Sequence, residues 1–192
     1  MIDKTSKKIK RITFFGDGDR RCEDKKYYRQ AFELAKLLAE NGYIVVNGGG
    51  PGVMKAATLG AKAGGGKVEI AILDPKNQPA NYEGVNKDNY ALADKIFMMS
   101  SYETRLKKLM NRGDAFVIFS GGTGTISEIG MTWNRAKYEY GHHEPLIFFG
   151  KFWRRIVADL IAGLGLEEKE KKVVEMVESP NEVLKLLKRI SG

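Results

Sequence analysis

The sequence predicts a single doubly wound α/β domain, with about seven mostly parallel strands and helices on both faces of the sheet. Short apolar runs alternate with segments of helical periodicity along the whole chain. The apolar runs are continuous, as in strands that are buried on both faces of a parallel sheet. No repeat or linker divides the 192 residues. We therefore expect a basic tail over residues 1–11 and one Rossmann-like domain over residues 12–192.

The expected strands are apolar runs bounded by glycine or by polar residues. ITFFG is the first, YIVVN runs directly into GGGPG, and DAFVIF precedes SGGTGT. Runs of this length that are rich in Val, Ile and Phe favour strands. The predicted strands cover residues 12–16, 43–47, 67–73, 95–99, 114–119, 145–149 and 172–177.

Helical spacing of apolar residues fills most of the intervals between these strands. The first expected helix runs from Asp24 to Asn41 and stops at Gly42. The second begins near Pro51, a residue that suits the first turn of a helix. Further helices are predicted over residues 102–112, from the SGGTGT loop to about residue 140, and over residues 152–161 and 181–190, whereas residues 74–93 are expected to form a long surface loop.

Charge and cysteine content restrict the classes of function. Residues 1–11 hold half of the net charge of +8, and the remaining excess is mixed with glutamates along helices, so a nucleic-acid partner is not expected. The longest apolar runs are only a few residues, too short to span a membrane. Cys22 is the only cysteine, which excludes an internal disulfide and a thiolate-rich metal site. These features favour a cytoplasmic location.

Three turns that follow predicted strands are rich in glycine: GDGDRR (16–21), GGGPG (48–52) and SGGTGT (120–125). The carboxyl ends of parallel strands meet at one edge of the sheet, where the ligands of such folds bind. Glycine lets backbone N–H groups approach a ligand closely, and the start of the following helix adds a partial positive charge. We therefore predict an anion site at this edge, where Thr123 and Thr125 add hydroxyl donors.

The better-known phosphate signatures are absent. SGGTGTISE lacks the lysine of a GxxxxGK[ST] loop, and GDGDRR does not match GxGxxG. Glu128 lies one turn beyond Thr125, where it either acts on a ligand or forms a capping box with Thr125. Arg105, on a helix that Ser100 or Ser101 can cap, is either the counterpart of Glu128 or a solvated side chain on a basic helix.

GGGPGVMKAA (48–57), Arg105 and the stretch NRGDAFVIFSGGTGTISE together resemble the LOG family of cytokinin-activating nucleotide phosphoribohydrolases, often labelled lysine decarboxylases. The resemblance implies hydrolysis of the N-glycosidic bond of a nucleoside 5′-monophosphate, either AMP-like or a cytokinin riboside monophosphate. The products are the free base and ribose 5-phosphate, and no metal or cofactor is required. It makes Arg105 and Glu128 the catalytic pair. It also implies a homodimer, with Trp133 and Tyr138 at the candidate dimer surface. The candidate phosphate- or nucleotide-binding residues are Gly48, Gly49, Gly50, Gly121, Gly122, Thr123, Gly124 and Thr125.

The chain departs from the LOG pattern in its loops. Ser120 replaces the proline of the PGGxGTxxE motif, and Leu106 stands where the plant-type enzymes have lysine. Asp17 and Asp19 stand where many members have serine, and acidic side chains repel a phosphate unless they face another part of the ligand. The alternative function is a non-catalytic carrier of a nucleotide or of the phosphorylated molybdenum cofactor. Such a protein needs the glycine loops but no catalytic pair.

Overall fold

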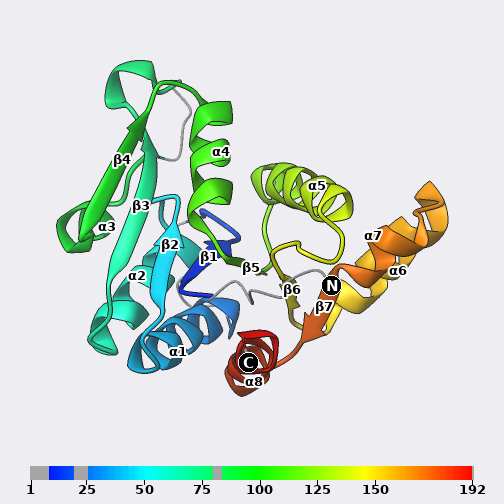
Figure 1. Cartoon of the computed structure of the whole chain (residues 1–192). Helices are drawn as coiled ribbons and strands as arrows, with labels where there is room; N and C mark the ends of the chain where they lie inside the picture. The colour runs from blue at the N-terminus through cyan, green and yellow to red at the C-terminus, as the bar shows by residue number, and fades with distance from the viewer. Residues whose placement is uncertain (1–8, 20–25, 80–83, 192) are drawn as a thin grey trace, which may run out of the picture.

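The computed structural model describes residues 9–19, 26–79 and 84–191, and it confirms the predicted fold class. Within these ranges, seven strands form one sheet in the order β4-β3-β2-β1-β5-β6-β7 (Figure 1). Every neighbouring pair is parallel, so the sheet is fully rather than mostly parallel. The strands are β1 (Arg11–Phe15), β2 (Ile44–Asn47), β3 (Val68–Leu73), β4 (Lys95–Met99), β5 (Ala115–Ile118), β6 (Leu146–Phe149) and β7 (Val174–Val177).

Helices cover both faces of this sheet (Figure 1). They are α1 (Lys26–Glu40), α2 (Val53–Ala63), α3 (Lys87–Leu92), α4 (Tyr102–Arg112), α5 (Thr123–Tyr138), α6 (Phe152–Leu164), α7 (Glu168–Lys172) and α8 (Pro180–Ser191), with a 3₁₀ turn over Pro75–Asn77. Apolar side chains of α1, α2 and α8 pack into one core, and those of α4, α5 and α6 pack into a second core on the opposite face.

The central strands contribute alternate side chains to the two cores. Phe14, Phe119 and Phe149 belong to the first core, where the rings of Phe119 and Phe149 stack with centroids 4.7 Å apart. Phe15 and Phe116 stack in the second core with centroids 5.8 Å apart. Because both faces of the sheet are covered, both sets of side chains must be apolar. This explains why the strands appear in the sequence as continuous apolar runs, and why their predicted bounds lie within two residues of the observed ones.

The prediction of a surface loop over residues 74–93 is wrong. This stretch contains the 3₁₀ turn and helix α3, whose N-cap is Asn86. The side chain of Asn86 accepts hydrogen bonds from two backbone N–H groups of the first helical turn. Asn89 is buried, and its amide donates to the carbonyl of Gly50. A helix of 6 residues shows no clear helical periodicity, and here a polar side chain anchors it.

Helix α7 also lies outside the sequence prediction. Its residues, EKEKK, are all charged, and none of them is buried. Glu167 and Glu170 form a capping box at its start. The Nζ atom of Lys137 lies 3.4 Å from the carboxylate of Glu167 and 3.5 Å from that of Glu170. Caps and ion pairs hold this helix, so the apolar spacing that reveals a helix in a sequence is missing.

The two aromatic residues expected at a dimer surface differ in burial. Trp133 packs in the second core, and its Nε1–H donates to the carbonyl of Glu170 at 2.8 Å. The prediction that Trp133 lies on a surface is therefore wrong. Tyr138 is 78% exposed, and the homodimer itself stays a prediction.

The start of the chain follows the expected course as far as it is described. β1 begins at Arg11, one residue before the predicted strand, and Ile9 packs in the first core. Residues 1–8, the rest of the expected basic tail, lie outside the described residues. Within the described ranges, no helix is both long and apolar enough to cross a membrane.

Candidate functional site

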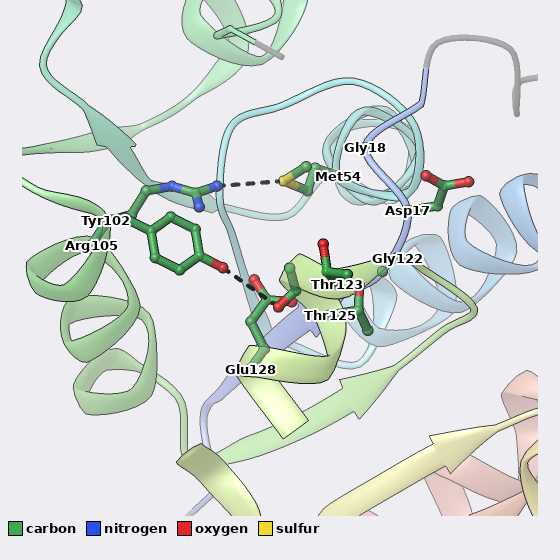
Figure 2. A pocket seen from close by; sticks show the side chains of 11 residues that line it. Asp17, Gly18, Met54, Tyr102, Arg105, Gly122, Thr123, Thr125 and Glu128 are labelled. Carbon is green, nitrogen blue, oxygen red and sulfur yellow. Dashed lines mark hydrogen bonds between the residues drawn. The ribbon is translucent and has the colours of Figure 1, made fainter. Parts of the chain in front are cut away.

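An open cavity of about 380 Å³ lies where the loops after β1 and β5 meet the first turns of α2, α4 and α5 (Figure 2). This is the carboxyl edge of the sheet, where doubly wound folds bind their ligands. The volume falls within the usual range for small-ligand sites. The cavity is lined by Gly16, Asp17, Gly18, Met54, Tyr102, Arg105, Gly122, Thr123, Gly124, Thr125 and Glu128.

Helix α5 begins at the cavity without a side-chain cap. Its N-cap is Gly122, which has no side chain to accept a hydrogen bond from the first turn. Thr123 and Gly124 are exposed at the wall, whereas Thr125 is buried. The backbone N–H groups of a first turn have no partner within their own helix, and the helix dipole adds a partial positive charge to them. This wall of the cavity therefore has the properties of an anion site.

Glu128 lies in the second turn of α5, and its half-buried side chain reaches the same cavity (Figure 2). The alternative in which Thr125 and Glu128 form a capping box is wrong. Gly122 is the N-cap, so Thr125 is the third residue of the helix and Glu128 is the sixth. Glu128 therefore lines the cavity without taking part in a capping box of its own helix.

Arg105 is almost fully buried, with 3% of its surface exposed. Its Nε donates to the carbonyl of Ala71 at 3.0 Å, and its Nη2 donates to the carbonyl of Gly48 at 2.9 Å. Nη2 also lies 3.8 Å from the sulfur of Met54 (Figure 2). These partners are neutral, and within the described part of the chain no carboxylate forms a salt bridge with Arg105. The alternative of a solvated surface arginine is therefore wrong.

The GGGPG loop supports the cavity from behind and does not line it. The N–H of Gly49 donates to Oδ1 of Asn47 at 2.8 Å, and the N–H of Gly50 donates to the sulfur of Met54 at 3.3 Å. A Cβ atom on Gly48 would overlap the guanidinium of Arg105. Of these glycines, which are predicted as ligand contacts, Gly48 accepts a hydrogen bond from Arg105 and Gly50 donates one to Met54, so they help to hold both side chains at the wall. Any contact between them and a ligand stays a prediction.

Asp17 joins the loops that surround the cavity. Its N–H donates to the carbonyl of Ser120 at 2.8 Å, and its carbonyl accepts from the N–H of Val53 at 2.9 Å. Its carboxylate accepts from the hydroxyl of Tyr27 at 2.8 Å and from the N–H of Asp19 at 2.9 Å. Asp17 therefore ties the loops after β1 and β5 to the start of α2. Gly16 and Gly18 of GDGDRR line the cavity with Asp17, whereas Arg20, Arg21 and Cys22 lie outside the described residues.

Some residues of the loop after β5 line the cavity, and others hold the surrounding loops in place. Of the predicted ligand contacts in this loop, Gly122, Thr123, Gly124 and Thr125 line the cavity and Gly121 does not, and the ligand contacts themselves stay predictions. A Cβ atom on Gly121 would overlap the hydroxyl of Thr125 and approach the backbone nitrogen of Asp17 to 2.9 Å. Glycine at this position permits the close approach of two loops.

Arg105 and Glu128, paired in the sequence analysis, line one cavity from different helices. The sequence model of the SLOG cluster4 family matches residues 9–184, a range that includes both. The chain belongs to the SLOG cluster4 family. The resemblance to LOG enzymes therefore holds for the broader SLOG group and does not extend to the LOG family specifically.

This chain is similar in sequence to a protein of Archaeoglobus fulgidus and similar in fold to several solved structures. An uncharacterized protein of Archaeoglobus fulgidus is 33% identical over 143 residues, which cover 74% of this chain and 86% of the relative. The solved structure of TM1055 has a TM-score of 0.72 at 23% identity, over 94% of this chain and 99% of that one. The molybdenum cofactor binding protein of Rippkaea orientalis has a TM-score of 0.69 at 21% identity, and the match covers 97% of this chain and 98% of that one. These likenesses show that this SLOG protein shares the fold of both solved structures.

Two residues that line the cavity of this SLOG protein, Tyr102 and Met54, were not predicted from the sequence. Tyr102 is the first residue of α4, and its position is set by Ser101 and Thr104, whose side chains form a capping box. Met54 lies in the first turn of α2 and contacts Arg105 through its sulfur. The serine cap was a usable signal for Tyr102, since it places Tyr102 at the start of the helix and Arg105 one turn later. No signal in the sequence points to Met54.

Proposed function

We propose that this protein binds a nucleoside 5′-monophosphate, or a similarly phosphorylated heterocyclic cofactor, and carries it without changing it chemically. The observation that supports this most directly is the convergence of two positive features on one cavity. One is the uncapped first turn of α5, and the other is the guanidinium of Arg105, whose hydrogen-bond partners are neutral.

The charge of the ligand follows from these features. Burying a cation beside neutral groups is costly, and a ligand with negative charge reduces that cost. A phosphate monoester carries between one and two negative charges at neutral pH and offers three acceptor oxygens. In this proposal the phosphate accepts hydrogen bonds from the first N–H groups of α5 and from the hydroxyl of Thr123, while Arg105 contributes longer-range attraction.

The carboxylate of Asp17 is compatible with this arrangement. It lies on the side of the cavity away from Arg105 and Glu128 (Figure 2), and it accepts a hydrogen bond from Tyr27. Because this bond turns the carboxylate toward α1, its repulsion of a phosphate at α5 is reduced.

The hydrogen bonds of Arg105 favour a carrier over an enzyme. Two of its donors are committed to the carbonyls of Ala71 and Gly48, so its burial is explained by holding the cavity wall. A role as a catalytic group is not needed to account for it. The molybdenum cofactor binding protein of Rippkaea orientalis has a similar fold, and its ligand, as its name states, is a cofactor that it binds.

The second candidate is hydrolysis of the N-glycosidic bond of the nucleotide, and the position of Glu128 favours it. A carboxylate beside the ribose would activate a water molecule for attack on C1′ or stabilise the positive charge that develops on the sugar. The C1′–N bond then breaks, and the base leaves with a proton. Glu128 lies on the cavity wall about one turn beyond the proposed phosphate position.

One experiment separates the two candidates. The protein is incubated with AMP, the bound fraction is measured by equilibrium dialysis, and the nucleotide is then recovered and separated by chromatography. We expect AMP to bind and to be recovered intact, and Glu128→Gln to bind it similarly. Release of adenine and ribose 5-phosphate by the wild type, abolished in Glu128→Gln, would establish the hydrolase instead. Failure to bind any nucleoside monophosphate would overturn both.

A further inference from the structure

Tyr102 brings an aromatic ring to the cavity wall. Among the described residues that line the cavity, no other is aromatic. Its ring lies between the side chain of Arg105 and the first turn of α5 (Figure 2). The ring therefore faces the space that a ligand anchored at α5 would enter.

The backbone of Tyr102 is held rigidly. The hydroxyl of Ser101 accepts from the N–H of Thr104 at 3.3 Å, and the hydroxyl of Thr104 accepts from the N–H of Ser101 at 3.1 Å. These two bonds fix the first turn of α4, in which Tyr102 is the first residue. The side chain thus extends from a fixed point, as a stacking surface requires.

The surroundings of the ring also restrict its position. The guanidinium carbon of Arg105 lies 6.0 Å from the ring centroid, and Arg105 is itself held by the carbonyls of Gly48 and Ala71. The hydroxyl of Tyr102 lies 3.5 Å from the carbonyl oxygen of Gly124, which is long for a hydrogen bond between two oxygens. The hydroxyl end of the side chain thus lies at the first turn of α5, and the ring spans the cavity wall between that turn and Arg105 (Figure 2).

We propose that Tyr102 determines the specificity of the site by stacking on the heterocycle of the phosphorylated ligand. This inference rests on the proposed function, in which α5 anchors the phosphate. Aromatic side chains stack on any base because every base has a π-face. The site then takes nucleotides and other phosphorylated aromatic heterocycles, and it discriminates against sugar phosphates that lack the ring.

The test compares AMP with ribose 5-phosphate, which has the same phosphate and sugar but no base. Dissociation constants for both are measured by calorimetry with the wild type, Tyr102→Phe and Tyr102→Leu. We expect Tyr102→Leu to weaken AMP binding by about tenfold, the scale of base stacking on an aromatic side chain, and to leave ribose 5-phosphate unchanged. Tyr102→Phe keeps the ring and should keep the preference for AMP. Tyr138→Leu, which removes an exposed tyrosine elsewhere on the chain, serves as the matched control.

The outcomes distinguish this inference from the proposed function. If the wild type binds both ligands and Tyr102→Leu weakens both equally, Tyr102 is only structural and the inference is overturned while phosphate binding stands. If the wild type binds neither ligand, both fail. If Tyr102→Leu does not fold, stacking is tested in the wild type alone by measuring the ultraviolet absorbance of bound AMP. A stacked adenine shows a reduced absorbance, and an unchanged absorbance contradicts stacking.

Discussion

The guanidinium of Arg105 donates a hydrogen bond to the backbone carbonyl of Gly48, with 2.9 Å between nitrogen and oxygen. The bond joins α4 to the loop after β2. It also explains the first glycine of GGGPG, because a Cβ atom on Gly48 would overlap the guanidinium. The loop therefore shapes the cavity by holding a side chain at its wall.

Replacing this glycine tests the relationship. Gly48→Ala is expected to lower the free energy of unfolding by about 2 kcal/mol, the usual cost of an overpacked interior. It should also weaken AMP binding at least tenfold, because Arg105 must move. Urea unfolding and calorimetry measure the two effects.

Gly130→Ala is the matched control for that substitution. Gly130 lies within α5, and a Cβ atom there meets nothing within 4 Å. Alanine in a helix is more favourable than glycine by about 1 kcal/mol, so the variant should be slightly more stable and bind AMP normally. A Gly48→Ala protein as stable as Gly130→Ala would contradict the proposed contact.

Substitution of Arg105 by lysine separates its charge from its geometry. Lysine keeps the positive charge but lacks the planar fork that reaches the carbonyls of Ala71 and Gly48. Arg105→Lys is expected to lose about 1–3 kcal/mol of stability, because a buried acceptor is left unpaired. The control is Arg155→Lys, whose side chain is 90% exposed and should change stability by less than about 0.5 kcal/mol. Equal unfolding midpoints for the two variants would show that the fork is unimportant.

Neighbouring glycines of the loop after β5 are expected to behave differently. A Cβ atom on Gly121 would overlap the side chain of Thr125, so Gly121→Ala should destabilise the fold and lower the melting temperature. Gly122 has open space around it and a negative φ, so Gly122→Ala should keep the melting temperature of the wild type. It adds a methyl group where the proposed phosphate approaches, and AMP affinity should fall severalfold. Normal AMP binding by a folded Gly122→Ala protein would show that the phosphate does not bind at this turn.

Asp94 gives the stability a defined dependence on pH. Burial raises the pKa of its carboxyl group, but hydrogen bonds from Lys62 and from the N–H of Val68, with the charge of Lys62, outweigh burial and leave the pKa below its ordinary value of 3.8. The stability that the carboxylate contributes is therefore complete above about pH 3.8 and is lost as the pH falls through the lowered pKa.

Asp94→Asn measures this contribution. The group is partly exposed, so the loss in unfolding free energy should be about 1 kcal/mol or less near neutral pH. The difference in unfolding free energy between Asp94→Asn and the wild type should shrink as the pH falls below 3.8, the ordinary pKa of an aspartate. Asp159→Asn, at an aspartate that is 72% exposed, is the matched control for removing a carboxylate charge. A difference that stays constant down to the acid transition would contradict the lowered pKa.

The fold was predictable because its sheet is buried on both faces. That requirement makes the strands continuous apolar runs, visible from Phe14 in β1 to Phe149 in β6. The elements that were missed have no such requirement. Helix α3 is anchored by the amide of Asn89, and helix α7 is anchored by a capping box and Lys137. Side-chain hydrogen bonds and ion pairs with residues distant in sequence leave no periodic pattern.

The site was predictable where its parts are adjacent in the sequence. Thr123 and Glu128 follow the same strand, so the glycine-rich start of α5 and its carboxylate could be placed together, although the N-cap at Gly122 could not. The burial of Arg105 could not be predicted, because it depends on carbonyls of β3 and of the loop after β2. The same holds for the supporting role of Gly48, which is visible only once α4 is packed against that loop.

A crystal structure with AMP would show whether a phosphate binds at the first turn of α5. We expect the phosphate oxygens within hydrogen-bond distance of the backbone nitrogens between Thr123 and Thr125, with Arg105 still bonded to Gly48. A phosphate bound elsewhere on the protein, or a cavity that stays without nucleotide at saturating AMP, would contradict this expectation.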